Sequence, residues 1–335
     1  MKNIDDIKVT LIIAIYKSAP FMPRLMESVF SQTHKNLEII LVDDGSPDES
    51  GMICDEYAAQ DKRVKVIHKQ NGGVCDARNA GMKIMTGEYL SVIDGDDWIE
   101  PDYVEYLLKL ALSCDADMSL TDSVFTTRDR KQNEEECVEQ WSPDKMAEYI
   151  LCSNLPIGPW NKLYKTEFIK KHNLLYGSLP SGATLYFVIC VANQNPLIIK
   201  GHRRIYNYRL NNVNSALTSR AVIYGQNALW NIKNVRKLTN TKSPRLLHVI
   251  DWHIWKNYNF LLKLIVATNQ RKKYWKEYIS CLWNIRVRLP KLLLVWGETK
   301  KEKFSMFKHS ILPLYYAKKA IKAEQEALKL DLQNL

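Results

Sequence analysis

Three carboxylates lie within four positions at the end of an apolar, β-like run. The run begins at Leu90 and stops on Asp94-Gly95-Asp96-Asp97. Like charges that crowd a strand end repel one another, so the arrangement is costly unless a cation or a hydrogen-bond network absorbs the charge. Mg²⁺ and Mn²⁺ are oxygen-seeking and take one or two protein carboxylates together with water and substrate phosphates. The alternative is a solvated acidic turn that simply ends a strand.

Strand and helix patterns alternate in the part of the chain that leads to these carboxylates. Apolar runs of strand length occupy residues 9–16, 37–42, 63–67 and 90–94, and helical patterns occupy residues 21–30, about 48–57 and about 74–85. The first run is apolar without alternation, which is typical of a strand buried on both faces of a parallel sheet. The sequence therefore predicts an α/β domain with right-handed crossovers.

Candidate ligand-binding residues follow three of these strands. Tyr16, Asp44 and the Asp94/Asp96 pair each fall where a strand ends. Ligands of parallel α/β sheets bind at the carboxyl ends of the strands. We therefore expect residues far apart in the sequence to converge on one crevice, which makes a purely structural role for the aspartates less plausible.

Composition describes an ordinary soluble globular protein. The chain has 335 residues, 46% apolar and 25% charged, enough for one large domain plus an appendage or for two domains. Its seven cysteines are odd in number, scattered and without a Cys-x-x-Cys pair, which argues against a disulfide framework and a zinc site and favours a reducing compartment. No signal peptide and no apolar run of about 18–20 residues is visible, so we expect a cytoplasmic location.

The positive charge belongs to the C-terminal third. Residues 221–335 hold 22 Lys+Arg against 7 Asp+Glu, or +15, which leaves −5 of the total of +10 for residues 1–220. We predict a domain boundary at this point, with a basic helical region over 221–335. Six of the nine tryptophans lie there, at positions 230, 252, 255, 275, 283 and 296.

This C-terminal region has the pattern of a membrane-surface element. Apolar residues recur at helical spacing from Trp275 to Leu289, and Lys276, Arg286 and Arg288 lie among them. Tryptophan favours the boundary between acyl chains and headgroups, and each basic residue near an anionic leaflet contributes about 1 kcal/mol. The alternative is a helical bundle with a solvated basic face. Nucleic-acid binding is disfavoured because no motif for it is visible.

Four motifs carry a resemblance to a known family. They are Ser31-Gln32-Thr33, the segment from Glu38 to Ser46, the segment from Asn71 to Gly81, and Asp94-Gly95-Asp96-Asp97 followed by Pro101. In order and spacing they resemble family 2 glycosyltransferases, which are nucleotide-sugar-dependent enzymes with a GT-A fold. The match is close over residues 8–125. It continues loosely through residues 159–164 and 206–209 to Ser215, where it looks like members that build capsular and exopolysaccharides.

The resemblance implies a role for each matching residue of the donor site. Ala14 and Tyr16 look like the base-binding end of the first strand, and Asp44 is similar to the aspartate that hydrogen-bonds the base. Arg78 matches a position near the nucleotide or sugar. Asp94 and Asp96 resemble the Asp-x-Asp pair, in which Asp96 would bind Mn²⁺ or Mg²⁺ directly and Asp94 would lie nearer the ribose or sugar.

On the acceptor side the resemblance is less complete. Trp160, Asn161 and Lys162 are expected to line the acceptor site, with core packing as the alternative for Trp160. Tyr208 and Arg209 would contact phosphate or close the domain.

The chain departs from the family at the general base. Inverting members supply it from a Gly-Glu-Asp-x-x-Phe segment, whereas the corresponding segment here is Gly182-Ala183-Thr184-Leu185-Tyr186-Phe187. Three readings stay open: another carboxylate serves, the segments correspond differently, or the chain binds a sugar nucleotide without efficient turnover. Asp122, after a strand-like run, is a possible substitute. His202 and His172 are further candidates, although lone histidines are more often structural.

The residues and the resemblance lead to two hypotheses. The first is a metal-dependent, inverting transferase that moves a sugar from a nucleotide diphosphate, UDP-sugar favoured, to a glycan or lipid-linked oligosaccharide at the cytoplasmic face of a bacterial membrane. The second is a catalytically degenerate partner or scaffold, motivated by Ala183-Thr184. The sugar, the linkage and the oligomeric state are not indicated by the sequence.

Overall fold

The computed structural model describes residues 3–133, 136–152, 155–177, 179, 181–210, 221–294 and 299–333. The chain forms two compact units, residues 1–210 and residues 211–335. The predicted boundary at residue 220 is the end of the segment 211–220, which lies outside the described residues and includes Ser215. Trp296 also lies outside them.

The first unit alternates strands and helices as the sequence predicts. In chain order its elements are η1 (Ile4–Asp6), β1 (Val9–Ile15), α1 (Met22–Phe30), β2 (Leu37–Asp43), α2 (Ser50–Gln60), β3 (Val64–His68), α3 (Val74–Ile84), β4 (Tyr89–Asp94), β5 (Trp98–Ile99), α4 (Tyr103–Ser113), β6 (Met118–Thr121), β7 (Phe125–Thr126), β8 (Glu139–Trp141), α5 (Pro143–Leu151), β9 (Lys162–Lys165), α6 (Thr166–Lys171), α7 (Ala183–Ala192), β10 (Ile198–Gly201) and β11 (Tyr206–Tyr208).

Most strands of the first unit form one mixed sheet. Its order is β3-β2-β1-β4-β9-β6-β10-β8. The first four strands are parallel, and β9 runs antiparallel to both β4 and β6, so β6 and β10 run in the same direction as β4. A separate small sheet has the order β5-β11-β7.

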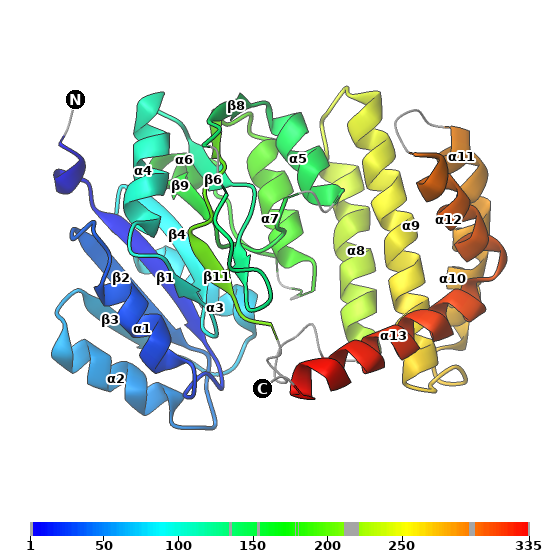
Figure 1. The fold of residues 1–335 in the computed structure, drawn as a ribbon, viewed down its shortest axis with the longest axis horizontal. Coiled ribbons are helices and arrows are strands. Elements are labelled where there is room, and N and C mark those ends of the chain that lie inside the picture. The colour runs from blue at the N-terminus through cyan, green and yellow to red at the C-terminus, as the bar shows by residue number, and fades with distance from the viewer. Residues whose placement is uncertain are drawn as a thin grey trace. The chain divides into compact units, whose positions relative to one another are not determined.

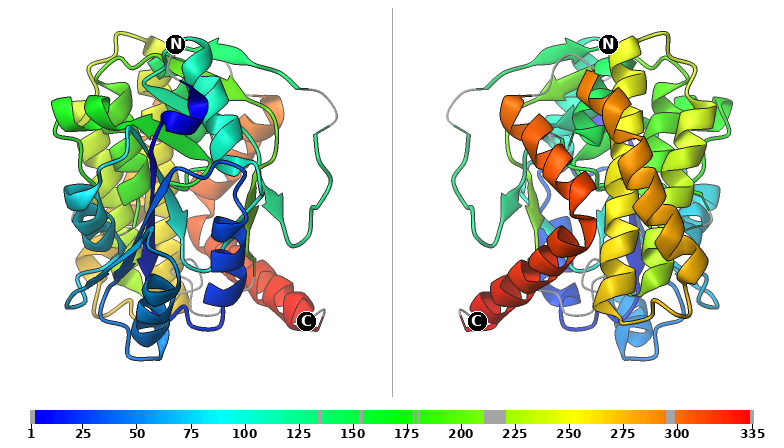
Figure 2. Two further views of the ribbon diagram at one scale, coloured as in Figure 1. Left: turned by 90° about the vertical axis from the view of Figure 1, so that its left-hand side faces the viewer. Right: turned by 90° about the vertical axis from the view of Figure 1, so that its right-hand side faces the viewer.

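Helices cover both faces of the large sheet, which explains why β1 shows no alternation of apolar and polar residues. Leu11, Ile13 and Ile15 pack into one buried cluster with residues of α1 and α4. The opposite face meets α3, where a Cβ on Gly81 would come within 2.6 Å of Ile12. Figure 2, left, shows α1 and α4 on one side of the sheet and α3 on the other.

Strand register brings the predicted site residues to one edge. Ala14 lies beside Val42 on β2 and beside Asp94 on β4, and Ile15 lies beside Asp43. Tyr16, Asp44 and Asp94 therefore sit at the same level of three neighbouring strands. The expected convergence at the carboxyl ends of these strands is confirmed.

His68 at the end of β3 gives the first unit a pH-dependent contact. Its Nδ1 lies 3.1 Å from Asp43 Oδ2, and its Nε2 lies 3.0 Å from Asp55 Oδ1. The bonds to Asp55 and then Asp43 raise the pKa of His68 above its ordinary value. Protonation therefore favours the folded state.

We expect the stabilisation from His68 to be complete below its unfolded pKa, about 6.5, and to be lost as pH rises through the higher folded value. Melting curves between pH 5.5 and 8.5 should show this fall in the wild type, and His68→Gln should flatten it. Identical pH dependence in the two proteins would contradict the prediction.

The second unit is a bundle of helices in the described part of the chain. They are α8 (Val222–Leu238), α9 (Pro244–Ala267), α10 (Trp275–Val287), α11 (Leu289–Leu294), α12 (Lys300–Ile311) and α13 (Pro313–Gln333). The long helix α9 packs against α8, α10 and α13, and Figure 1 shows α8 and α9 side by side. Ser243 caps α9 by accepting from Leu246 N, and Pro244 begins the helix. Over the described residues, no helix combines the length and apolarity needed to cross a bilayer.

Candidate donor and metal site

The acidic turn after β4 is pressed against the end of β1. At Gly95 a Cβ would come within 2.8 Å of Ala14 O and 2.9 Å of Ser18 Oγ. Any side chain there would push the turn off β1, so glycine is required by close approach. Asp94 and Asp96 remain partly exposed, whereas Asp97 is fully buried. The first two carboxylates can therefore meet a ligand and the third cannot.

Asp94 is held by an arginine from α3. Arg78 is buried and its Nη2 donates to Asp94 Oδ1 at 2.7 Å. Burial alone would lower the pKa of Arg78, but the charge of Asp94, with smaller contributions from Tyr176, Cys75 and the hydrogen bond to Asp94, makes the net shift upward. Arg78 therefore stays charged beside Asp94.

The segment that departs from the family lies beside this pair. Arg78 Nη1 donates to Thr184 Oγ1 at 3.3 Å. Thr184 is in the first turn of α7, which follows Gly182 in the left-handed region at φ 81°. A hydroxyl thus stands next to the Arg78–Asp94 pair, on the segment that the resemblance matches to the family's acids.

Asp97 ties the acidic turn to β11. Tyr206 Oη donates to Asp97 Oδ2 at 2.7 Å and accepts from Asp94 N at 3.3 Å, and Arg209 N donates to Asp97 Oδ1 at 2.7 Å. Burial, followed by the charges of Asp96 and Asp94, raises the pKa of Asp97 well above its ordinary value. Asp97 is therefore a positioning residue, and Tyr206 is a member of the site that sequence reasoning did not identify.

Asp44 positions the loop that leads into α3. Its Oδ1 accepts from Lys69 Nζ and Gly72 N at 2.6 and 2.9 Å, and its Oδ2 accepts from Gly73 N at 2.7 Å. Tyr16 is 46% exposed at the end of β1, so its ring is available to stack on a base. The assignments of Ala14, Tyr16 and Asp44 to base binding stay predictions.

The donor atoms present fit a hard divalent cation. The described residues contain no group of three or more His, Cys, Asp or Glu side chains arranged as a complete metal cage. Mg²⁺ and Mn²⁺ sites beside phosphates do not need one, because substrate oxygens and water fill most positions. Asp96 and the free oxygen of Asp94 supply the one or two carboxylates that such a site takes.

The predicted acceptor residues are almost inaccessible. Trp160 is 7% exposed and stacks on Tyr206 with ring centroids 4.7 Å apart, and Asn161 and Lys162 are fully buried. Lys162 Nζ donates to four loop oxygens, those of Pro156, Gly158 and Trp160 and Oδ1 of Asn161. Burial lowers the pKa of Lys162 to about 7. The acceptor role of Trp160, Asn161 and Lys162 stays a prediction. Their contacts indicate instead that they stabilise the loop that precedes β9.

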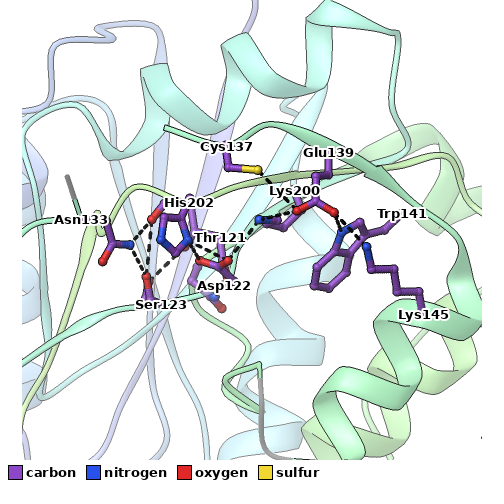
Figure 3. A network of polar contacts seen from close by, with 11 residues as sticks. Thr121, Asp122, Ser123, Asn133, Cys137, Glu139, Trp141, Lys145, Lys200 and His202 are labelled. Atoms are coloured by element: carbon purple, nitrogen blue, oxygen red, sulfur yellow. Dashed lines mark hydrogen bonds and ion pairs between the residues drawn. The ribbon is translucent and has the colours of Figure 1, made fainter. Parts of the chain in front are cut away.

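Asp122 belongs to a polar network at the ends of β6 and β10 (Figure 3). Both of its oxygens lie 2.8 Å from His202 Nδ1, and Oδ2 accepts from Lys200 Nζ at 3.1 Å. Lys200 also lies 3.2 Å from Glu139 Oε1. The two candidates that the sequence offered separately, Asp122 and His202, are thus in direct contact.

Comparison with known proteins agrees with the fold and the motifs. The sequence model of the family described as "Glycosyl transferase family 2" matches residues 10–170, from β1 through almost all of α6. Over these residues the first unit therefore has the sequence pattern of glycosyl transferase family 2, and its fold is GT-A.

Three known proteins illustrate the similarity. EpsH of Bacillus subtilis (strain 168) is 36% identical over 172 residues, which are 50% of this chain and 50% of that protein. Staphylococcus aureus TarS 1–349 in complex with UDP has a TM-score of 0.67 at 16% identity, covering 98% of this chain and 92% of that one. The mannosyltransferase PcManGT of Pyrobaculum calidifontis in complex with GDP-Man and Mn²⁺ has a TM-score of 0.57 at 11% identity, covering 96% and 86%. The chain thus spans about half the length of EpsH, and the two structures share its fold.

Proposed function

We propose that this protein is a metal-dependent, inverting glycosyltransferase that uses a nucleotide-diphosphate sugar, with a UDP-sugar favoured. The observation that carries the proposal is the placement of Asp94 and Asp96 at the end of β4, beside the end of β1 and against Arg78. The match to the glycosyl transferase family 2 model supports glycosyl transfer, and the UDP complex of TarS supports the choice of nucleotide. The PcManGT complex, which contains Mn²⁺, supports a divalent metal.

The residues of this edge suit a leaving diphosphate. Bound at Asp96, with Asp94 beside it, Mn²⁺ or Mg²⁺ would supply positive charge next to the phosphates. Arg78 fixes Asp94 on the α3 side, and its Nε is buried without a partner in the described part of the chain. Tyr206 and Asp97 hold the turn rigid from the other side. A preorganised site of this kind stabilises the charge that develops when the glycosidic bond breaks.

We propose that His202, oriented by Asp122, accepts the proton of the acceptor hydroxyl. Both residues follow strands that run parallel to β4, so they lie at the same edge of the sheet as Asp94. The carboxylate holds Nδ1, and Nε2 has no partner within the described residues. An aspartate that orients a histidine and stabilises the imidazolium is a recurrent device for a general base.

His202→Gln is expected to lower kcat by about 10²–10⁴-fold, the usual contribution of a general base, with little change in donor KM. His172→Gln, a change of the other candidate histidine, serves as the matched control and should keep wild-type kcat. Full activity of His202→Gln would reject the assignment.

The acceptor is proposed to be a glycan or a lipid-linked oligosaccharide used in cell-surface polysaccharide synthesis. The alternative function is a catalytically degenerate partner or scaffold, which the hydroxyl of Thr184 at the family's acid position favours. Turnover by the isolated chain would dismiss the alternative. Nucleotide binding without turnover, restored by a partner protein, would establish it.

We further propose that the second unit binds the inner face of the cell membrane through one face of α10. Trp275, Ile279, Trp283 and Val287 recur at four-residue steps and are 43–67% exposed. Tyr278, Cys281 and Ile285, on the opposite face, are buried. Lys276 and Arg286 fall within the exposed face at 100° per residue, whereas Glu277 falls outside it. Tryptophan and basic residues on one helix face suit an anionic bilayer surface.

The full chain is expected to sediment with phosphatidylserine vesicles and to be released by salt, because surface electrostatics is screened. Trp275→Ser/Trp283→Ser should abolish sedimentation, whereas Trp252→Ser, on α9, should not. Equal recovery in the supernatant with and without vesicles would refute membrane binding. A salt-independent dimer that disappears in the double variant would instead identify the face as a protein interface.

A further inference from the structure

Three arginines surround a single tryptophan next to the acidic turn. The guanidinium carbons of Arg24, Arg209 and Arg130 lie 3.6, 5.1 and 5.8 Å from the ring centroid of Trp98. They come from α1, from the residue after β11, and from the segment after β7. Three segments far apart in the sequence thus place their cations on one side chain.

These cations have few carboxylates close to them. Arg130 Nη2 lies 3.9 Å from Glu100 Oε1, and Asn207 Nδ2 donates to the same oxygen at 2.8 Å. Arg130 Nη1 donates to Asn207 Oδ1, which leaves the other donors of Arg130 for a ligand. Arg24 has no hydrogen bond or ion pair within the described residues. Burial and then the charges of Arg209 and Arg130 lower the pKa of Arg24, and the charges of Glu27 and Glu100 oppose this shift without reversing it. The cluster therefore carries like charges that an anion would neutralise.

The arginines are preorganised to bind such an anion. Arg24 lies over the Trp98 ring, and Arg130 also lies 4.7 Å from the Phe125 ring. An arginine held against an aromatic face keeps its in-plane N–H donors free, and it loses less conformational entropy when it binds phosphate in a bidentate manner. The small sheet supports the arrangement, because Asn207 on β11 pairs with Trp98 on β5 and with Phe125 on β7.

The cluster lies on the other side of the acidic turn from Arg78. Arg78 comes from α3 and meets Asp94, whereas Arg24 comes from α1, which packs on the opposite face of the sheet and against β5. Arg209 Nε donates to Asp96 O at 2.7 Å, so the cluster borders the proposed metal residue. A donor diphosphate held at Asp94 and Asp96 would leave Arg24 and Arg130 for a second anion.

We propose that Arg24 and Arg130, on Trp98, bind a phosphate group of the acceptor, so that the acceptor is a phosphate-bearing molecule. This rests on the proposed transferase function, since it assigns the second substrate of that same site. The binding of two anions on either side of Asp96 would place the acceptor next to the bond that breaks.

The test measures binding of glycerol 3-phosphate, as a simple phosphate ester, to the full chain saturated with UDP and Mg²⁺, by ³¹P NMR titration. Wild-type protein should bind the ester, and Arg24→Gln or Arg130→Gln should weaken it roughly tenfold, as expected for a lost hydrogen bond to a charged group. The affinity for UDP should change less than about twofold, because donor binding uses other residues. Arg63→Gln, which removes an arginine near the Phe30 ring, is the matched control.

Three outcomes would overturn the assignment. Wild-type protein that binds UDP but not the ester would reject the acceptor site alone and leave the donor site intact. Equal weakening of UDP and ester would show that the arginines bind the donor diphosphate. Unchanged ester binding in both single variants, with wild-type melting temperatures, would show that they bind neither.

Discussion

Asp96→Ala is expected to reduce glycosyl transfer by roughly a hundredfold or more and to abolish the dependence of nucleotide binding on Mn²⁺ or Mg²⁺. Asp96 is one of the two partly exposed carboxylates of the turn, and its backbone carbonyl accepts a hydrogen bond from Arg209. Removal of its side chain leaves Asp94, already paired with Arg78, as the nearest carboxylate for the cation. Initial rates with UDP-sugars and UDP calorimetry at several metal concentrations measure both effects.

The control for this prediction is Asp115→Asn. Asp115 is an acid of the same unit whose side chain is 80% exposed and pairs with Lys165 at 2.8 Å. It should retain wild-type rate and metal dependence. Metal-dependent UDP binding that survives in Asp96→Ala would exclude Asp96 as a metal ligand.

Arg78→Met is expected to give the largest loss of stability among single changes at the site. The guanidinium is 6% and the Asp94 side chain 26% exposed, and they meet at 2.7 Å. Removing one partner of a buried pair leaves the other charge uncompensated, at a cost of about 3 kcal/mol. For a unit of about 200 residues this corresponds to a fall in melting temperature of about 10 °C. Donor binding should be lost as well, because Asp94 is no longer oriented.

Arg78→Lys should recover part of the stability, since it restores the charge but not the forked geometry that reaches both Asp94 and Thr184. Arg203→Met removes a 47% exposed arginine that pairs with Asp102 at 2.8 Å, and it should change the melting temperature far less. Equal effects of Arg78→Met and Arg203→Met would contradict the role given to the buried pair.

The four parallel strands β1 to β4 of the large sheet could be predicted, because each is a local apolar run of strand length. Apolar runs end at or just before Tyr16, Asp44 and Asp94. Neighbouring parallel strands place their carboxyl ends at the same edge of the sheet, independently of the conformation of the loops. The motif also predicts that Thr184 lies near the site, because the resemblance matches the segment 182–187 to the family's general-base segment.

Contacts between distant segments could not be predicted. Nothing local to Tyr206 indicates that its hydroxyl bridges Asp94 and Asp97, and nothing local to Asp122 indicates that it meets His202. Trp98 and Arg24 lie on different elements that approach one another only when α1 packs against β5. The burial of Lys162 could not be predicted either, because a lysine is ordinarily exposed. Its four acceptors are three backbone carbonyls of the preceding loop and the side-chain oxygen of Asn161.

Helix α10 shows why a periodic pattern alone does not identify an exposed face. The sequence places Trp275, Tyr278, Ile279 and Ile285 on one apolar stripe. In the structure the stripe divides, with Tyr278 and Ile285 buried in the bundle and Trp275 and Ile279 exposed. A helix that is apolar on more than one face can both pack on a neighbour and present a second surface, and only the bundle decides which residues do which.

The most direct test of the donor site is the melting temperature of the full chain with UDP-, GDP- and dTDP-sugars, each with Mn²⁺, with Mg²⁺ and with EDTA. A ligand that binds only the folded state at 100 times its Kd stabilises it by about 2.7 kcal/mol. We predict an increase of several degrees with a UDP-sugar and metal, which EDTA and Asp96→Ala remove. No shift and no hydrolysis with any of these sugars in the presence of metal would contradict the account.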